Sequence, residues 1–283
     1  MKSLTVIKRL FLLVSLALIL SCGNDKKEGK LFIIGGGTVT SAMIDKMIKE
    51  SGIDKGGYGV ILPMSSEEPD TAILEFTTLF AERSCKNIYG LNFRKGESFS
   101  PSRIDSIRNA RLVFMSGGDQ SRFMDIIKGT QVKEAIHEVY DKGGIIGGYS
   151  AGAALMSKIM ITGNELKYPD NEVSFNTIEA NNIEIIEGVG MLETVIIDQH
   201  FIKRKRLNRL ISACIEHPKS VCVGIDESTA ILVDKDKATI YGLNQVIVLH
   251  NPSPDIKTEN GLLGGKNLTL DVYLPGESFS LAD

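Results

Sequence analysis

The chain has 283 residues, of which 43% are hydrophobic and 24% are charged, and its formal net charge at pH 7 is −3. This composition is that of an ordinary globular protein, long enough for one large domain or two small ones. The weak negative charge argues against nucleic acid as a partner. The absence of Trp, with only 6% aromatic residues, argues against a base-stacking surface.

Residues 1–22 have the layout of an export signal. Basic residues precede an apolar run at 10–20 that is too short for a stable membrane span. Residues 19–22, Ile-Leu-Ser-Cys, resemble a bacterial lipoprotein processing site, which implies cleavage before Cys22 and lipid on its thiol. Polar residues 23–30 would then form a tether. We expect an exported lipoprotein, anchored to a membrane in the periplasm or at the cell surface; plain secretion is the alternative.

From residue 30 to residue 150, short apolar segments alternate with amphipathic segments. Strands are expected at 30–34, 59–62, 87–91, 111–115 and in the run that enters Ser150, and helices at 41–51, 70–83, 101–109, 121–128 and 131–142. Strands that alternate with helices predict a three-layer, doubly wound α/β fold with a mostly parallel sheet. No boundary or repeat is visible, so residues 31–283 are expected to form a single domain.

The pattern changes after the helix that follows Ser150. Polar residues 164–182 are expected to form a loop or flap. Later strands are expected at 195–198, 220–224, 229–233, 238–241, 245–250 and 267–274, a helix at 203–216 and a loop at 251–265. Short strands this close together indicate that the sheet ends in antiparallel strands.

Residues 148–152 form a G-x-S-x-G motif between an apolar strand pattern and a small-residue helix pattern. In this geometry Ser150 occupies a tight turn at the carboxyl end of a strand, flanked by glycines because side chains there would clash. The N–H of Ala151, at the helix start, would point to a developing oxyanion. The alternative is an ordinary glycine-rich turn with an incidental serine.

Two more glycine-rich loops, 35–37 and 117–120, would lie at the same edge of the sheet. The dinucleotide motif G-x-G-x-x-G fails because Thr40 stands at its third glycine. The spacing of the cysteines fits no zinc pattern, and we expect neither cofactor nor metal. Cys214 and Cys222 could form a disulfide or remain buried thiols.

Residues 198–201, Asp-Gln-His-Phe, end another expected strand. Of the four histidines, only His200 lies at a strand's carboxyl end, and we expect it at the same edge of the same sheet as Ser150, where it could serve as a base; a structural histidine is the alternative. Arg204, Arg206 and Arg209 follow, and guanidinium groups bind carboxylates bidentately. On one helix Arg204 and Arg209 would lie about 140° apart, so the three share a pocket only if the helix begins late. A solvated basic face is the alternative.

Four segments together resemble the cyanophycinase branch of the peptidase E family of serine peptidases, family S51: residues 117–120, 148–153, 198–201 and 224–230. The resemblance covers about residues 31–250. It implies a class I glutamine amidotransferase-like, flavodoxin-like fold. It also implies hydrolysis of cyanophycin, a poly-aspartate that carries arginine on its side chains, to β-Asp-Arg dipeptides.

The resemblance also implies roles for single residues. Ser150 would be the nucleophile, His200 the base and Glu165 the third member of the triad, with Glu172 as the alternative. Substrate-pocket positions are Gln120, Asp198, Gln199, Arg204, Arg206 and Arg209, and the oxyanion would be held by Gly117, Gly118 and Ala151. Asp198 could instead hold one of the arginines. Asp226 and Glu227 are interpreted as structural. Tyr149, where the family often has Thr, and a longer stretch between Ser150 and His200 are departures that bear on the substrate.

Three functions remain open from the sequence. The leading hypothesis is a serine exopeptidase acting on arginine-bearing acidic peptide. The second is an aspartyl or isoaspartyl dipeptidase, and the third is a catalytically silent lipoprotein that binds peptide. The sequence neither requires nor excludes a homodimer.

Overall fold

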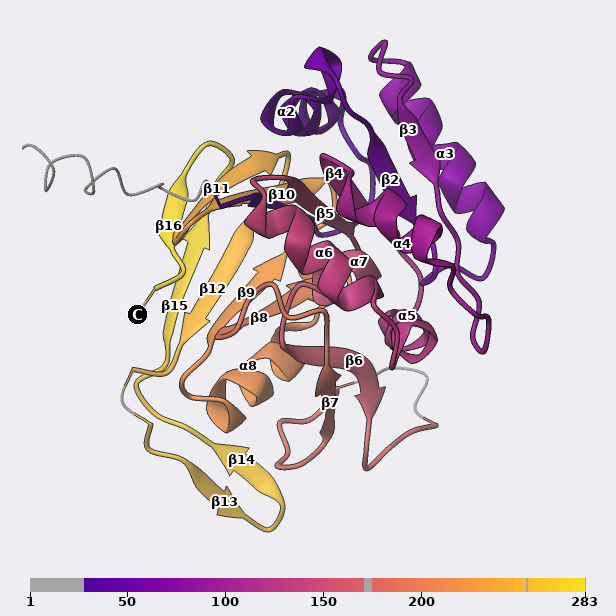
Figure 1. Ribbon diagram of the computed structural model, residues 1–283. Helices are drawn as coiled ribbons and strands as arrows, with labels where there is room; N and C mark the ends of the chain where they lie inside the picture. Colours follow the sequence, from indigo (N-terminus) through magenta and orange to yellow (C-terminus); the bar gives the residue numbers. More distant parts are fainter. Residues whose placement is uncertain (1–27, 171–174, 253, 283) are drawn as a thin grey trace, which may run out of the picture.

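A computed structural model describes residues 28–170, 175–252 and 254–282 (Figure 1). Its main sheet has eight strands in the order β16-β11-β10-β1-β5-β4-β2-β3. The parallel strands are β1 (Lys30–Ile34), β5 (Ile145–Tyr149), β4 (Leu112–Met115), β2 (Gly59–Leu62) and β3 (Ile88–Gly90), and the antiparallel strands are β10 (Thr229–Asp234), β11 (Lys237–Gly242) and β16 (Ser278–Ser280). This confirms the predicted α/β fold with antiparallel strands after a mostly parallel sheet.

Helices cover both faces of the parallel strands. One face carries α2 (Ser41–Ser51), the short 3₁₀ helix η1 (Ile53–Lys55) and α3 (Pro69–Ala81), and the other carries α4 (Pro101–Arg108), α5 (Gln120–Ile127), α6 (Val132–Asp141) and α7 (Ala151–Ala154) (Figure 1). Strand β1 shows why: Phe32 and Ile34 pack in the core under α2 and α3, and Leu31 and Ile33 in the core under α4 and α6. A strand buried on both faces is continuously apolar, as this one is.

A second sheet packs against α7 and contains the strand that leads to His200. Its order is β15-β12-β9-β8, with β8 (Val195–Gln199), β9 (Val221–Ile225), β12 (Val246–His250) and β15 (Thr269–Tyr273). Strands β8 and β9 are parallel, and the other pairs are antiparallel. The expectation that Ser150 and His200 lie on one sheet is therefore wrong. Apolar packing between the two sheets nevertheless brings the strand ends together.

Helix α8 (Leu207–Glu216) covers the outer face of the second sheet. The sequence predicts a helix from residue 203, but His200 and Lys205 have positive φ angles of 49° and 54°. An α-helix does not accommodate such residues. The helix therefore begins late, as a common pocket for the three arginines requires.

Two hairpins form small sheets of their own, one whose strands flank the expected loop 164–182 and one inside the expected loop 251–265. Strands β6 (Ile159–Glu165) and β7 (Ile183–Glu187) pair at the border of residues 164–182, and β13 (Lys257–Glu259) pairs with β14 (Leu262–Gly264) inside residues 251–265. The strands β13 and β14 are mostly exposed and lack the alternation that would reveal them, whereas β6 buries Met160 and Ile161 in the apolar core.

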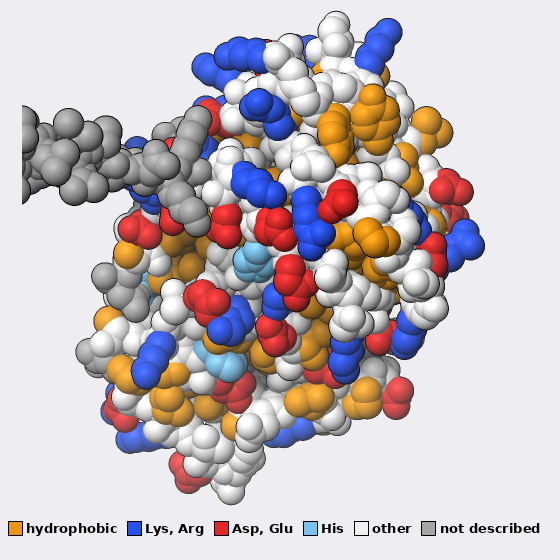
Figure 2. Space-filling model, in the orientation of Figure 1, with side chains coloured by type: hydrophobic (Ala, Val, Ile, Leu, Met, Phe, Trp, Pro, Cys, Tyr) orange, Lys and Arg blue, Asp and Glu red, His pale blue; other side chains and the backbone are white. Residues whose placement is uncertain are grey.

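The lipoprotein signal, including Cys22, lies outside the described residues, and so does Glu172. Among residues 28–170, 175–252 and 254–282, no helix has the length and apolarity that crossing a membrane requires. Cys214 and Cys222 are buried free thiols, so the alternative disulfide is not formed. On the face drawn in Figure 2, acidic and basic side chains are interspersed. Ion pairs such as Arg108–Glu138 and Lys133–Glu187 join opposite charges along the chain.

Candidate active site

Ser150 stands on the sharp turn between β5 and α7. Its φ and ψ angles, 53° and −108°, are a strained combination for a residue with a side chain. Close backbone approach explains both flanking glycines. A Cβ at Gly148 would lie 2.2 Å from the carbonyl oxygen of Gly152, and a Cβ at Gly152 would lie 2.2 Å from that of Met115. The predicted turn geometry around Ser150 is present.

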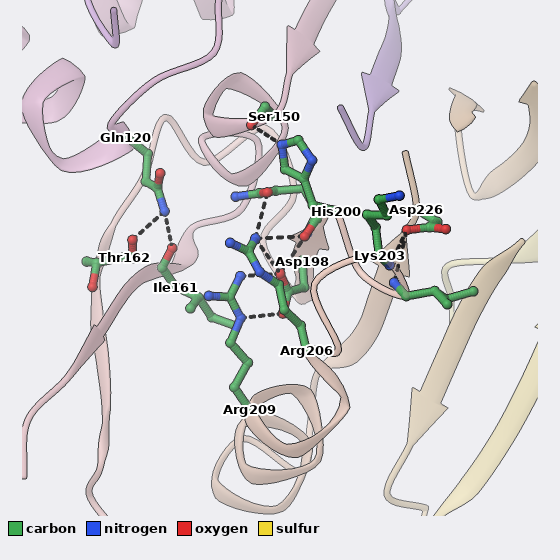
Figure 3. Close-up of polar contacts among 12 residues, drawn as sticks. Gln120, Ser150, Ile161, Thr162, Asp198, His200, Lys203, Arg206, Arg209 and Asp226 are labelled. Carbon is green, nitrogen blue, oxygen red and sulfur yellow. Dashed lines mark hydrogen bonds and ion pairs between the residues drawn. The ribbon is translucent and has the colours of Figure 1, made fainter. Parts of the chain in front are cut away.

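The imidazole of His200 meets the Ser150 hydroxyl. Nε2 of His200 lies 2.8 Å from Ser150 Oγ, although 50 residues separate them in the chain (Figure 3). His200 immediately follows β8, and its backbone N–H donates to the carbonyl of Gly35 in the loop after β1. Burial lowers the pKa of His200, and a hydrogen bond from its ring to Glu227 partly opposes that effect. Burial thus favours the neutral imidazole, which is the form that can accept the proton of Ser150.

The carboxylate that holds His200 is Glu227, which the sequence analysis interpreted as structural. Its Oε1 lies 2.7 Å from Nδ1 of His200. An ionised carboxylate only accepts hydrogen bonds, so Nδ1 carries the proton and Nε2 is left to accept the Ser150 O–H. Strand register explains the position. Gln199 at the end of β8 pairs with Ile225 at the end of parallel β9, so the residues that follow both strands meet.

Glu165 does not occupy the triad, so its expected role as the third member is wrong. It is the last residue of β6, is buried, and accepts a hydrogen bond from Nδ2 of Asn182 at 2.8 Å. The prediction followed the position of an acid in the resembled family. The signal that would have found Glu227 is its place two residues after a strand parallel to that of His200. Asp226 is structural as predicted, because its Oδ1 accepts the N–H groups of Ile202 and Lys203 (Figure 3).

The three residues expected to bind an oxyanion lie around Ser150. Gly117 and Gly118 border the same cleft as the Ser150 hydroxyl. Gly118 has φ of 130°, and a Cβ there would lie 2.1 Å from the carbonyl oxygen of Ser65. Ala151 is the first residue of α7, where the backbone N–H has no partner within the helix.

A basic pocket of about 240 Å³ lies on one side of Ser150. Arg204, Arg206 and Arg209 line it, as the sequence predicts for the substrate pocket. Asp198 lies behind them with a fully buried side chain and forms a bidentate pair with Arg209, Nε to Oδ2 at 2.6 Å and Nη2 to Oδ1 (Figure 3). Asp198 was expected either to bind substrate or to hold one of the chain's own arginines, and in the structure it holds Arg209.

Asp198 does not balance the charge of all three arginines, because both of its short contacts with them go to Arg209. Arg206 donates to the side-chain and backbone oxygens of Gln199, both at 2.7 Å, and its Nη1 lies 3.6 Å from Asp198. Burial and repulsion from Arg209 lower the pKa of Arg206 to about 10. Arg204 is exposed and borders the clefts on both sides of Ser150. Two carboxylates, Asp198 behind the pocket and Asp119 on its lining, face three guanidinium groups, and the remaining positive charge makes this pocket suited to an anion.

Gln120 connects the pocket to the β6–β7 hairpin. Its Nε2 donates to the carbonyl oxygens of Ile161 and Thr162 at 2.9 and 2.6 Å, and the residue lines the basic pocket (Figure 3). Thr162 and Asn164 form the hairpin wall of the same pocket. The end of β6 thus contributes a wall of the pocket that Gln120 fixes in place, and Asn164 is the one residue of this wall that belongs to the segment expected to be a flap.

The cleft on the other side of Ser150 is acidic. It has a volume of about 470 Å³ and extends along the start of α3. Glu67, Glu68 and Glu75 line it together with Tyr149. Opposite charges therefore flank the hydroxyl of Ser150. No group of three or more potential metal ligands occurs among the residues that the structure describes.

Comparison with known proteins agrees with this geometry. The sequence pattern of peptidase family S51 matches residues 31–241. The chain belongs to peptidase family S51. It is 30% identical over 233 residues to a cyanophycinase from Nostoc sp., covering 79% of this chain and 75% of the relative. It is 32% identical over 181 residues to a cyanophycinase from Geminocystis herdmanii, covering 62% and 63%.

The fold of this S51 peptidase also matches a solved structure. A crystal structure of a peptidase from an acI-B1 Actinobacterium superposes with a TM-score of 0.67 and 21% sequence identity, covering 90% of this chain and 98% of the other. Family membership makes the protein a hydrolase of the serine peptidase type. The Ser150–His200–Glu227 chain of hydrogen bonds is consistent with that chemistry.

Proposed function

We propose that this S51 peptidase is an exopeptidase that hydrolyses cyanophycin-like polymer, a poly-aspartate with arginine on its side chains, to β-Asp-Arg dipeptides. The observation that carries the proposal is the hydrogen-bonded series Ser150–His200–Glu227 between two clefts of opposite charge. The cyanophycinase relatives support the substrate class.

In the proposed mechanism, Ser150 Oγ attacks the scissile carbonyl carbon while Nε2 of His200 takes the hydroxyl proton. Glu227 accepts from Nδ1 and stabilises the imidazolium. The negative charge on the carbonyl oxygen is held by the N–H of Ala151 and one from the Gly117–Gly118 loop, each worth about 3–4 kcal/mol. Nε2 then protonates the leaving amine as the C–N bond breaks. Water, activated by the same imidazole, hydrolyses the acyl-enzyme.

The charges around Ser150 fit both halves of the substrate. A carboxylate at the end of the polymer would bind in the basic pocket through Arg204 and Arg206, which Asp198 leaves without a full counter-charge. The guanidinium of a substrate arginine would lie in the acidic cleft, near Glu68 and Glu75. A small pocket walled by the β6–β7 hairpin favours a chain end over the middle of a polymer.

The test is release of soluble dipeptide from insoluble cyanophycin, followed by mass spectrometry. Wild type should release β-Asp-Arg, and Ser150→Ala should release none while keeping its circular dichroism spectrum. The double variant Glu68→Gln/Glu75→Gln should raise KM for this substrate and leave KM for an uncharged isoaspartyl dipeptide unchanged. Hydrolysis of α-aspartyl dipeptides with no action on cyanophycin would instead favour the dipeptidase hypothesis. Undiminished release by Ser150→Ala would refute the proposal.

We also propose that the mature enzyme is exported and carries lipid on Cys22, a residue outside the described part of the chain. The support is the apolar run at 10–20 followed by the processing-site resemblance at 19–22. Radioactive fatty acid should label the wild-type protein. Absence of label, or label that persists in Cys22→Ala, would contradict the anchor.

A further inference from the structure

The loop of residues 35–38, which follows β1, touches every element that carries a member of the triad. The backbone N–H of His200 donates to the carbonyl of Gly35 at 2.8 Å. Gly36 lies against the imidazole, because a Cβ at that position would lie 2.2 Å from Cε1 and 2.5 Å from Nε2 of His200. Its φ of 119° also favours glycine. The backbone of Gly36 therefore forms one wall of the space that holds the ring.

The same loop is bound to the turn that bears Glu227. The N–H of Ser228 donates to the carbonyl of Gly36 at 2.7 Å, and the N–H of Thr38 donates to the Ser228 hydroxyl at 3.2 Å. A Cβ at Gly37 would lie 2.7 Å from Cβ of Glu227, so the backbones are in close contact there. The base and its carboxylate are thus positioned by one short segment.

Tyr149, the residue before the nucleophile, completes this arrangement. Its Oη donates to the carbonyl of Gly37 at 2.8 Å. Its ring is half-buried against Phe76, with ring centroids 5.4 Å apart. This hydrogen bond joins the end of β5, which carries Ser150, to the loop that lies on His200. No other side-chain hydrogen bond to the carbonyl of Gly37 occurs among the described residues.

We propose that Tyr149 is a positioning residue for the peptidase reaction: its hydroxyl holds the Gly35–Gly37 loop against His200, and so fixes the imidazole between Ser150 and Glu227. The proposal rests on the proposed function for its kinetic consequences. The loop after β1 then serves to position the triad residues and does not bind a ligand.

The variant that tests the proposal is Tyr149→Phe, which removes one hydroxyl and keeps the aromatic wall of the cleft. A base displaced by a fraction of an ångström should lower kcat by about tenfold to a hundredfold, with KM within about twofold of wild type. The matched control is Tyr58→Phe. Tyr58 Oη also donates to a backbone carbonyl at 2.8 Å, that of Ser106, far from the triad. This control should keep the wild-type kcat.

A second readout needs no substrate. Burial is the largest influence on the pKa of His200, and Glu227, Arg204 and Arg206 also act on it. A loosened loop admits water to the ring, so in Tyr149→Phe the pKa should rise toward the ordinary value of about 6.5, with the other three groups unchanged. Nuclear magnetic resonance can follow this titration, since the chain has only four histidines.

The outcomes separate the two proposals. Lower kcat together with a raised His200 pKa in Tyr149→Phe, and neither change in Tyr58→Phe, supports the positioning role. Wild-type kcat and an unchanged His200 pKa in Tyr149→Phe overturn it while leaving the peptidase assignment intact. A wild-type protein that cleaves neither cyanophycin nor isoaspartyl dipeptides refutes the proposed function, and the titration alone then decides the role of Tyr149.

Discussion

The exchange of Glu227 for Gln tests the triad at the position where the structure departs from the sequence prediction. The carboxylate fixes the proton on Nδ1 of His200, and an amide can turn its NH₂ toward the ring and favour the wrong tautomer. Losing a fully buried triad carboxylate costs about 10⁴ in kcat. The Glu227 side chain is 27% exposed, so water and the amide oxygen can replace part of its effect. We expect a loss of about 10³, or about 4 kcal/mol of barrier.

The assay is a comparison of kcat for Glu227→Gln and Glu165→Gln on the same peptide substrate. Glu165→Gln keeps an oxygen that can accept from Asn182, and it should retain the wild-type kcat. The pH profile adds a second criterion. The hydrogen bond to Glu227 raises the His200 pKa, so in Glu227→Gln the acid limb should move to lower pH. Wild-type activity in Glu227→Gln, with a large loss in Glu165→Gln, would refute this assignment.

Three further predictions follow from the same geometry. Because burial lowers the pKa of His200, wild-type kcat/KM should stay high as pH falls to 6.5 and decline only through a lower pKa; an acid limb centred above 6.5 would contradict this. Gly152→Ala should destabilise the fold by about 3 kcal/mol in urea unfolding, because its Cβ would overlap the carbonyl oxygen of Met115. Asp226→Ala should cost about 2 kcal/mol in the same assay, since the N–H groups of residues 202–203 lose their acceptor, and unchanged stability would show that water replaces it.

Much of the fold could be predicted because periodicity reports burial directly. The helix expected at 41–51 is α2, Ser41–Ser51, capped by Thr40 and ended by Gly52 in the left-handed conformation. Strands buried on both faces, such as β1 and β5, were equally clear. The hairpin β13–β14 is mostly exposed and pairs only with itself, so it carries no such signal, and residues 251–265 are expected to form a loop.

The site was predictable where function depends on a local motif, and less so where it depends on pairing between strands. The turn geometry of Ser150 follows from its flanking glycines, and the position of His200 from its place after an apolar strand. Glu227 was missed because its role depends on β9 lying parallel to β8, a pairing that no local pattern shows. The sequence shows only that the three arginines can share a pocket if the helix begins late. The positive φ of Lys205, which delays the start of α8, cannot be read from the sequence.

The most direct test of the central claim is the mass of the protein after reaction with a fluorophosphonate, followed by peptide mapping. A serine activated by His200 and Glu227 should gain one phosphonyl group, on Ser150, at a rate that falls steeply in His200→Ala and Glu227→Gln. No adduct on the folded wild-type protein, or an adduct on another residue, would contradict the assignment of Ser150 as the nucleophile.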